Sequence, residues 1–150
     1  MKKLNVFVFM FSLLFASFSL AQADNVRALM MALDDEYKAR AIYSRVLDDF
    51  GRVRPFSKII YSEQRHIDAL IPFFAKYGVD VPDDSYYGRV PGYDSIQQAC
   101  EAAIIGEMAN VELYNKIFEL ADDPDLIAVF ENLQWVSQNR HLPAFQRCAE

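Results

Sequence analysis

The chain has little glycine, and no stretch of it sustains the alternation of apolar and polar residues that marks a half-buried strand. Its 150 residues include five glycines, two cysteines and two histidines. Apolar residues instead recur at steps of three and four, which is the spacing of one helix face. The sequence therefore predicts an all-α protein and argues against a sheet.

A cluster of basic residues is also missing. The chain contains 15 Lys and Arg against 21 Asp and Glu, which gives a net charge of −6. A protein of this charge without a basic patch is a poor partner for nucleic acid or anionic lipid. The acidity is compatible with cation binding, although on its own it mainly favours solubility.

No apolar run reaches the roughly 20 residues that a membrane span needs. The longest run, Val6 to Leu20, follows two lysines and precedes the small-residue triplet Ala21-Gln22-Ala23. This order is typical of a secretory signal peptide, so we expect residues 1–23 to be a signal peptide. A membrane anchor is the weaker alternative, because the run is short and contains three serines.

Cleavage before Asp24 would leave residues 24–150 as one domain and would remove two lysines and no acid. The net charge would change from −6 to −8. We expect an exported protein, periplasmic or extracellular, that is no longer attached to a membrane once the signal is removed.

Four helices are expected in this domain, and their ends are marked by Gly, Pro and capping residues. They span about 25–50, 55–77, 95–121 and 124–148, and Pro72 predicts a kink in the second. The connection from Gly78 to Ser95 is much longer than the others. Two helical hairpins joined by one long crossover define the ferritin-like type of four-helix bundle, and a short-looped bundle would not need such a connection.

Polar residues interrupt the apolar faces of these helices. One face of the second helix, at positions 56, 59, 63, 66, 70, 73 and 77, is apolar or aromatic except at Glu63 and His66. Glu36 and Glu107 hold similar positions on the first and third helices, and His141 does so on the fourth. Two residues of an antiparallel hairpin lie level when their mean falls at the turn, which holds for Glu36 with His66 and for Glu107 with His141.

Several buried carboxylates would strongly destabilise a bundle unless positive charge compensated them. A pair of divalent ions supplies that charge and takes neutral imidazoles as ligands. Di-iron and di-manganese bundles use one Glu from each of two helices and a Glu-x-x-His from each of the other two. Five of these six metal-ligand positions are matched, by Glu36, Glu63, His66, Glu107 and His141.

Gln138 stands at the sixth position, in Gln138-x-x-His141. An amide oxygen can bind a metal, but it is neutral and cannot bridge two ions as a carboxylate does. Gln138 is therefore a doubtful ligand, and one of the two metal positions is expected to be weak, open or empty. Taken alone, Glu-x-x-His is more often a solvated pair.

Tyr43 and Tyr114 each follow a candidate ligand by seven residues, and we expect them to pack in the core beside the ligands rather than to relay electrons. Cys100 and Cys148 are level across the second hairpin. An oxidising compartment favours a disulfide between them, with two free buried thiols as the alternative.

Several stretches together resemble a known family: DEYKARAIY, FGRVRPFSKII, EQRHIDAL, KYGVDVP and HLPAFQRC. They are similar to the uncharacterised branch of the ferritin-like superfamily called domain of unknown function 2202, over essentially all of residues 24–150. The resemblance implies a ferritin-like bundle with a di-iron site at the five residues named above. It implies no particular reaction.

Three functions remain open. The first is a non-haem di-iron or di-manganese oxidoreductase that reacts with O2 or peroxide, by iron oxidation or peroxide removal. The second is a non-catalytic protein that buffers metal ions, and the third is a structural bundle whose polar seam fixes helix register. Iron is the expected cofactor, as two ions or one, with manganese or zinc as alternatives. An enzyme and a non-enzymatic binding protein are both compatible with these residues, and so is a homodimer.

Overall fold

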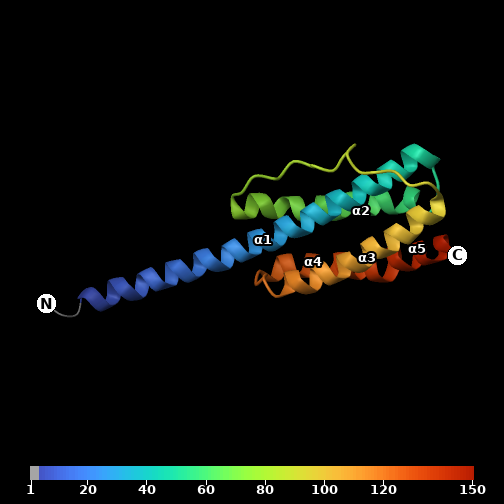
Figure 1. Ribbon diagram of the computed structural model, residues 1–150. Helices are drawn as coiled ribbons and strands as arrows, with labels where there is room; N and C mark the ends of the chain where they lie inside the picture. The colour runs from blue at the N-terminus through green and yellow to red at the C-terminus, as the bar shows by residue number, and fades with distance from the viewer. Residues whose placement is uncertain (1–3) are drawn as a thin grey trace.

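The computed structural model describes the backbone of residues 4–150 and the side chains of residues 20–150. Within these residues it contains helices and no strand, which confirms the predicted all-α bundle (Figure 1). The elements are α1 Leu4–Phe50, α2 Phe56–Tyr77, α3 Ile96–Phe118, α4 Pro124–Val136, the π-helical turn η1 Ser137–His141 and α5 Leu142–Ala149. Because α4, η1 and α5 follow one another directly, they act as the fourth helix of the bundle.

Helix α1 begins much earlier than the predicted start near residue 25. It is 47 residues long, and its sequence contains neither glycine nor proline, so no residue in it breaks the helix. The predicted signal peptide overlaps this helix, but residues 1–3 and the side chains of residues 4–19 lie outside the described part of the chain. Among the described residues, no helix has the length and apolarity that a membrane span requires.

The other helix ends agree closely with the sequence signals. Gly78 adopts a left-handed conformation with φ 68° and ends α2, as expected of a C-terminal glycine. The Ser95 hydroxyl accepts a hydrogen bond from the Gln98 amide and caps α3. Helix α3 ends at Phe118 instead of Ala121, because its last turn tightens and the Glu119 amide bonds to the Lys116 carbonyl.

The long crossover, residues 78–95, runs along the first hairpin (Figure 1). Asp84 accepts a 2.7 Å hydrogen bond from Arg40 of α1, which also forms an ion pair with it. The Tyr86 hydroxyl donates to Asp34 at 2.8 Å. These contacts fix the crossover against α1.

Two apolar clusters fill the bundle and leave a polar layer between them. The first cluster includes Leu29, Leu70, Phe74, Tyr114 and Phe130. The second includes Tyr43, Val46, Phe56, Cys100 and Phe145. The buried charged residues belong to neither cluster, so they lie between two well-packed apolar layers.

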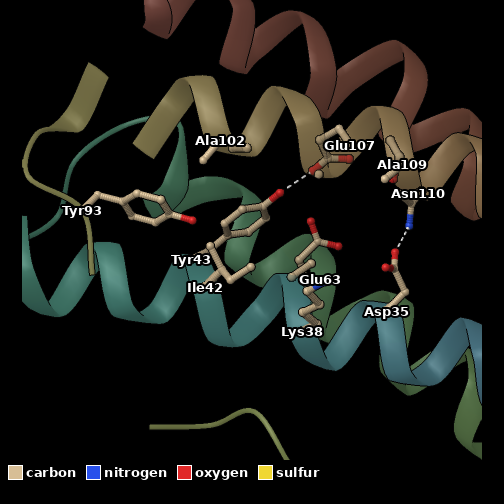
Figure 2. A pocket seen from close by; sticks show the side chains of 14 residues that line it. Asp35, Lys38, Ile42, Tyr43, Glu63, Tyr93, Ala102, Glu107, Ala109 and Asn110 are labelled. Carbon is tan, nitrogen blue, oxygen red and sulfur yellow. Dashed lines mark hydrogen bonds between the residues drawn. The ribbon is translucent and has the colours of Figure 1, made fainter. Parts of the chain in front are cut away.

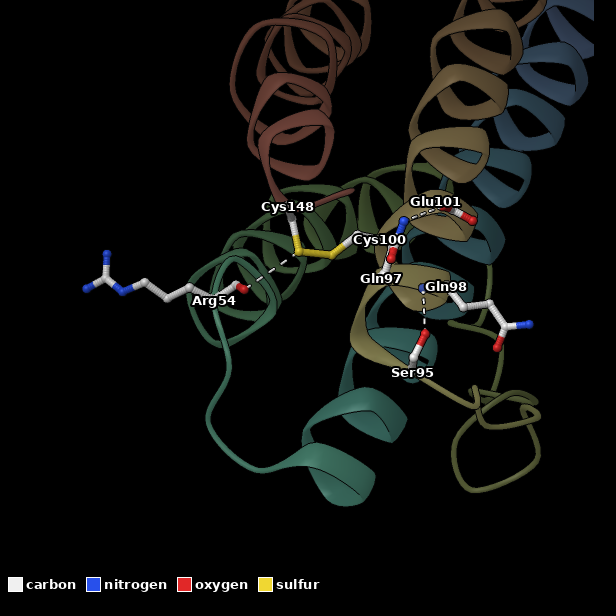
Figure 3. The surroundings of a disulfide bond; sticks show 7 residues. All are labelled: Arg54, Ser95, Gln97, Gln98, Cys100, Glu101 and Cys148. Carbon is white, nitrogen blue, oxygen red and sulfur yellow. Dashed lines mark hydrogen bonds between the residues drawn. A yellow bond between two sulfur atoms is a disulfide. The ribbon is translucent and has the colours of Figure 1, made fainter. Parts of the chain in front are cut away.

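The predicted disulfide is confirmed. Cys100, in the first turns of α3, is bonded to Cys148, in the last turn of α5, with 5.8 Å between their Cα atoms (Figure 3). The bond joins the two ends of the second hairpin that lie farthest from its turn.

Candidate metal centre

The five predicted ligands converge in the polar layer, although they come from four different segments. Glu36 lies on α1, Glu63 and His66 on α2, Glu107 on α3 and His141 on η1. None of the five is more than 4% exposed. Their donor atoms form two groups of three, each within 4.8 Å, and Glu63 belongs to both groups.

Glu63 uses a different oxygen in each group. His66 Nδ1 lies 3.0 Å from Glu36 Oε2 and 3.1 Å from Glu63 Oε2. His141 Nδ1 lies 3.1 Å from Glu63 Oε1 and 3.4 Å from Glu107 Oε1. The two imidazole rings stack with 5.4 Å between centroids. The site is therefore two Glu–His–Glu groups that share one carboxylate.

The neighbouring carboxylates favour the cationic form of both histidines. Burial lowers the pKa of His66, but the Glu36 and Glu63 carboxylates outweigh burial and raise it to about 10. Burial also lowers the pKa of His141, and Glu107 and Glu63 raise it to about 9. A metal ion bound through the Nδ1 atoms would replace these protons, so binding would release them.

The carboxylates respond to burial and to the imidazoles in different ways. Burial raises the pKa of Glu36 above its usual value. Burial also acts to raise the pKa of Glu63, but the adjacent His141 and His66 rings outweigh it and lower the pKa. The two imidazoles thus favour the ionised form of Glu63.

Two buried atoms at the centre of the site lack hydrogen bonds. Glu63 Oε1 and His141 Nδ1 are 3.1 Å apart, yet neither has a partner in hydrogen-bonding geometry. Buried polar atoms normally find partners, and an orphaned pair calls for an explanation such as an ion. A carboxylate oxygen and an imidazole nitrogen are both ligands of iron, manganese and zinc, so the donor set fits a divalent metal.

The two predicted tyrosines donate hydrogen bonds to two of the carboxylates. The Tyr43 hydroxyl donates to Glu107 Oε1 at 2.6 Å, and the Tyr114 hydroxyl donates to Glu36 Oε1 at 2.9 Å. Burial raises the pKa of both phenols well above 10, so they stay protonated and act as donors. They also pack in the apolar clusters, as expected.

Gln138 does not join the site. It is exposed and borders a surface hollow together with Met108 and Glu112. The reason is the π-helical turn η1, because a wider turn no longer places residues three apart on one face. Ser137 is buried in its place. Gln138 was predicted as a doubtful ligand on the assumption of an unbroken α-helix, and it lies outside both groups of donor atoms in the structure.

A second polar pair, Asn110 and Asp35, lies beside the site and was not among the predicted site residues. Asn110 donates from Nδ2 to Asp35 Oδ2 at 2.7 Å, while its Oδ1 is buried without a partner. Burial raises the pKa of Asp35 to about 6. Asn110 follows Glu107 by three residues on the same face, which is a usable signal. Asp35 has no such signal, because it neighbours a ligand only in sequence.

A small cavity lies between α1 and α3 and reaches the carboxylates (Figure 2). Its volume is about 80 Å³, and Glu63, Glu107 and Tyr43 form part of its wall. Small residues such as Ala103 and Gly106 line the rest. Since one water occupies roughly 30 Å³ of liquid, the cavity holds two or so waters or a molecule of a few atoms. Pockets for organic ligands are usually about 300 Å³ or larger.

Fold and site together define an all-helical bundle protein with buried Glu and His groups that could hold a metal ion. The family model described as "Uncharacterized protein domain (DUF2202)" matches residues 25–90. This match covers the first hairpin and most of the crossover, which is less than half of the chain.

A similar solved structure is that of hypothetical protein MJ0754 from Methanococcus jannaschii DSM 2661. The two chains share 25% sequence identity with a TM-score of 0.72, and the match covers 82% of this chain and 78% of that one. No curated protein matches the sequence.

Proposed function

We propose that this chain is a ferritin-like protein that holds two divalent ions, iron in preference to manganese, and reacts with O2 or peroxide. The shared carboxylate of Glu63 supports this proposal most directly. One oxygen faces His66 and the other, which lacks a hydrogen bond, faces His141. A carboxylate between two Glu–His groups suits a pair of ions better than a single ion.

The donor set is also balanced in charge. Three carboxylates and two neutral imidazoles would face two divalent ions, so most of the positive charge would be compensated inside the protein. Such ions would supply one-electron chemistry toward oxygen species. The protein's own residues would hold the carboxylates in place through Tyr43 and Tyr114, and the apolar clusters would exclude bulk water.

The cavity beside the site supports a small co-substrate. Its volume of about 80 Å³ suits O2, peroxide or water and is too small for an organic substrate. The proposed reactions are therefore oxidation of iron(II) or removal of peroxide, both of which need only small inorganic reactants.

Metal content is the direct test. The protein is loaded anaerobically with iron(II) or manganese(II), desalted and analysed for metal. We expect up to two ions per chain, fewer than one in Glu63→Gln, and an unchanged value in Gln138→Ala, whose side chain is exposed. Metal-free protein after loading would contradict the proposal. If Glu63→Gln and Gln138→Ala lose equal amounts of metal, the metal is not bound at this site.

The exposure of Gln138 favours a second function, metal buffering. It leaves the metal site with five of the six ligand side chains that the superfamily uses. The chain could then bind metal without turnover, as a buffer. Rates of iron(II) oxidation by O2 separate the two functions. An oxidation rate that is the same in the wild type and in Glu63→Gln would favour buffering.

We also infer that the protein is exported and that residues 24–150 are its mature domain. The Cys100–Cys148 disulfide supports this inference, because disulfides persist mainly in oxidising compartments. Expression of the full chain in a bacterial host, followed by fractionation and mass spectrometry, tests it. We expect a periplasmic product that starts at Asp24. A cytoplasmic product with an intact N-terminus would contradict it.

A further inference from the structure

A second hollow reaches the histidines from the opposite side of the bundle. It is a groove of about 560 Å³ between α2 and the α4–η1 segment, and His66 and His141 form part of its floor. It shares no lining residue with the small cavity beside the carboxylates. Its volume falls in the range of pockets that bind small organic molecules, about 300–1,000 Å³.

The groove is basic in an otherwise acidic protein. Lys58, Arg65 and Arg140 line it, and no Asp or Glu does, although the chain as a whole has a net charge of −6. None of these three cations forms an ion pair with any residue in the described part of the chain. Three unpaired cations around a concave surface attract an anion and raise its local concentration.

The rest of the groove is apolar and includes an exposed aromatic ring. Trp135 is 50% exposed and lies under the Arg140 guanidinium, with 5.3 Å from Cζ to the ring centroid. Ile59, Leu133 and Val136 also line the groove. A guanidinium matches a carboxylate with two parallel hydrogen bonds, and the indole offers a face or edge for a planar ring.

The groove faces the side of the imidazoles that the carboxylates leave free. Nδ1 of each ring points to the glutamates, so the Nε2 edge lies toward the groove. Ser62, which also lines the groove, places its hydroxyl 3.4 Å from His66 Nε2. His141 Nε2 has no hydrogen-bond partner within the described residues, so an anion in the groove could accept a bond from it.

From these observations we propose that the groove is a binding site for a small aromatic carboxylate. The carboxylate group lies among Lys58, Arg65 and Arg140, and the ring lies against Trp135 and the apolar floor. This proposal goes beyond the proposed metal chemistry and does not depend on it, since every residue that carries it is present in the metal-free chain.

Trp135 is the chain's one tryptophan, so its fluorescence reports on the groove directly. Isophthalate, the probe, is titrated into the full-length protein as isolated, and binding is followed by tryptophan emission and by calorimetry. We expect submillimolar binding that weakens as salt is added, because the rim charges are screened. Isophthalamide, which is neutral, should not bind, and succinate, which lacks a ring, should bind about tenfold more weakly, since a buried ring contributes of that order.

Two matched variants locate the site. Arg140→Gln should weaken isophthalate binding by up to about fivefold, the effect of losing one exposed charged contact. Arg147→Gln makes the same change in charge at an exposed position of α5, outside the groove, and should leave binding unchanged. Circular dichroism checks that both variants are folded.

Three results would overturn the proposal: no response to isophthalate at millimolar concentration, equal binding of isophthalamide, or equal weakening in the two arginine variants. Binding to anionic lipid vesicles in the absence of isophthalate binding would also overturn it, because the groove would then be part of a membrane-facing surface. None of these results would bear on metal content, so the two proposals fail separately.

Discussion

The Tyr43 hydroxyl of α1 lies 2.6 Å from Glu107 of α3, and in return the Tyr114 hydroxyl of α3 lies 2.9 Å from Glu36 of α1. Each tyrosine follows the glutamate of its own helix by seven residues and bonds to the glutamate of the other. The exchange is reciprocal and ties the two hairpins together at the level of the site. It gives a physical reason for the repeated Glu–Tyr spacing in the sequence.

Loss of either phenol should therefore weaken both the fold and the site. In Tyr114→Phe the buried Oε1 atom of Glu36 loses its donor, which should lower the free energy of unfolding by about 1–3 kcal/mol and the metal affinity by about tenfold. Tyr43→Phe should lower both quantities in the same way, because Glu107 loses the hydrogen bond from the Tyr43 hydroxyl. Urea unfolding and metal titration measure the two effects.

Tyr61→Phe is the matched control for these variants, because Tyr61 is 56% exposed. Its unfolding free energy should stay within about 0.5 kcal/mol of the wild type. If all three variants behave alike, the hydroxyl contacts contribute nothing specific to the carboxylates.

Metal binding should stabilise the folded chain. At a free ion concentration 100 times the dissociation constant, we expect about 2.7 kcal/mol of added stability, because the unfolded chain has no assembled site. Thermal unfolding with and without a chelator measures this gain. Gln138→Ala should keep the gain in full and Glu63→Gln should lose most of it. A loss of the gain in Gln138→Ala would show that the exposed amide reaches the metal.

The sequence predicted the five clustered residues because their placement depends on local geometry. Helix spacing puts Glu63 and His66 on one face, and the position of each turn makes Glu36 level with His66. Both rules hold here because the breaks after Phe50 and Tyr77 fall where the sequence signals place them.

The remaining features were missed for different reasons. The π-helical turn exposes Gln138. The turn itself contains no proline or glycine, but Pro143 follows it in the first turn of α5 and cannot donate a hydrogen bond to the Asn139 carbonyl, and the sequence prediction did not use this signal. The contact of Asp35 with Asn110 depends on the rotation of α1 relative to α3. The early start of α1 was missed because a signal-like composition does not prevent helix formation.

Gly106 provides a test of the cavity. A Cβ atom added there meets no other atom within 4 Å, so Gly106→Ala should stabilise helix α3 by about 0.5–1 kcal/mol. Gly106→Leu should partly fill the cavity of about 80 Å³, keep the metal content and slow oxidation by O2.

Ile105→Leu, at the exposed neighbouring position, is the control for the larger variant. Stopped-flow oxidation of bound iron(II) measures the rates. Equal rates in Gly106→Leu and Ile105→Leu would mean that small molecules reach the site by another route.

The disulfide should stabilise the second hairpin without affecting the site. The two cysteines are 48 residues apart, and the chain-entropy estimate for a loop of that length is about 4 kcal/mol. The double variant Cys100→Ser, Cys148→Ser should lose up to this amount and keep its metal content. If samples of the double variant that are shown to be folded lose much of their metal, the disulfide instead contributes to the geometry of the site.

Asp123 lies at the end of the bundle opposite the disulfide, and it should make the free energy of unfolding depend on pH. Its carboxylate accepts hydrogen bonds from the Tyr77 hydroxyl at 2.6 Å and from the Asp125 amide at 3.0 Å, and it forms an ion pair with Lys76.

Burial acts to raise the pKa of Asp123, but the Lys76 and Tyr77 contacts outweigh it and lower the pKa below 3.8. The stabilisation is therefore present above about pH 4, the pKa region of an unfolded Asp, and is lost as the pH falls through the lower folded value. Asp123→Ala should lose about 1–2 kcal/mol at neutral pH, largely from the helix cap. The deficit relative to the wild type should shrink in acid, and urea unfolding between pH 2 and 7 measures it. A deficit that does not change with pH would assign the whole effect to the cap and none to the charge.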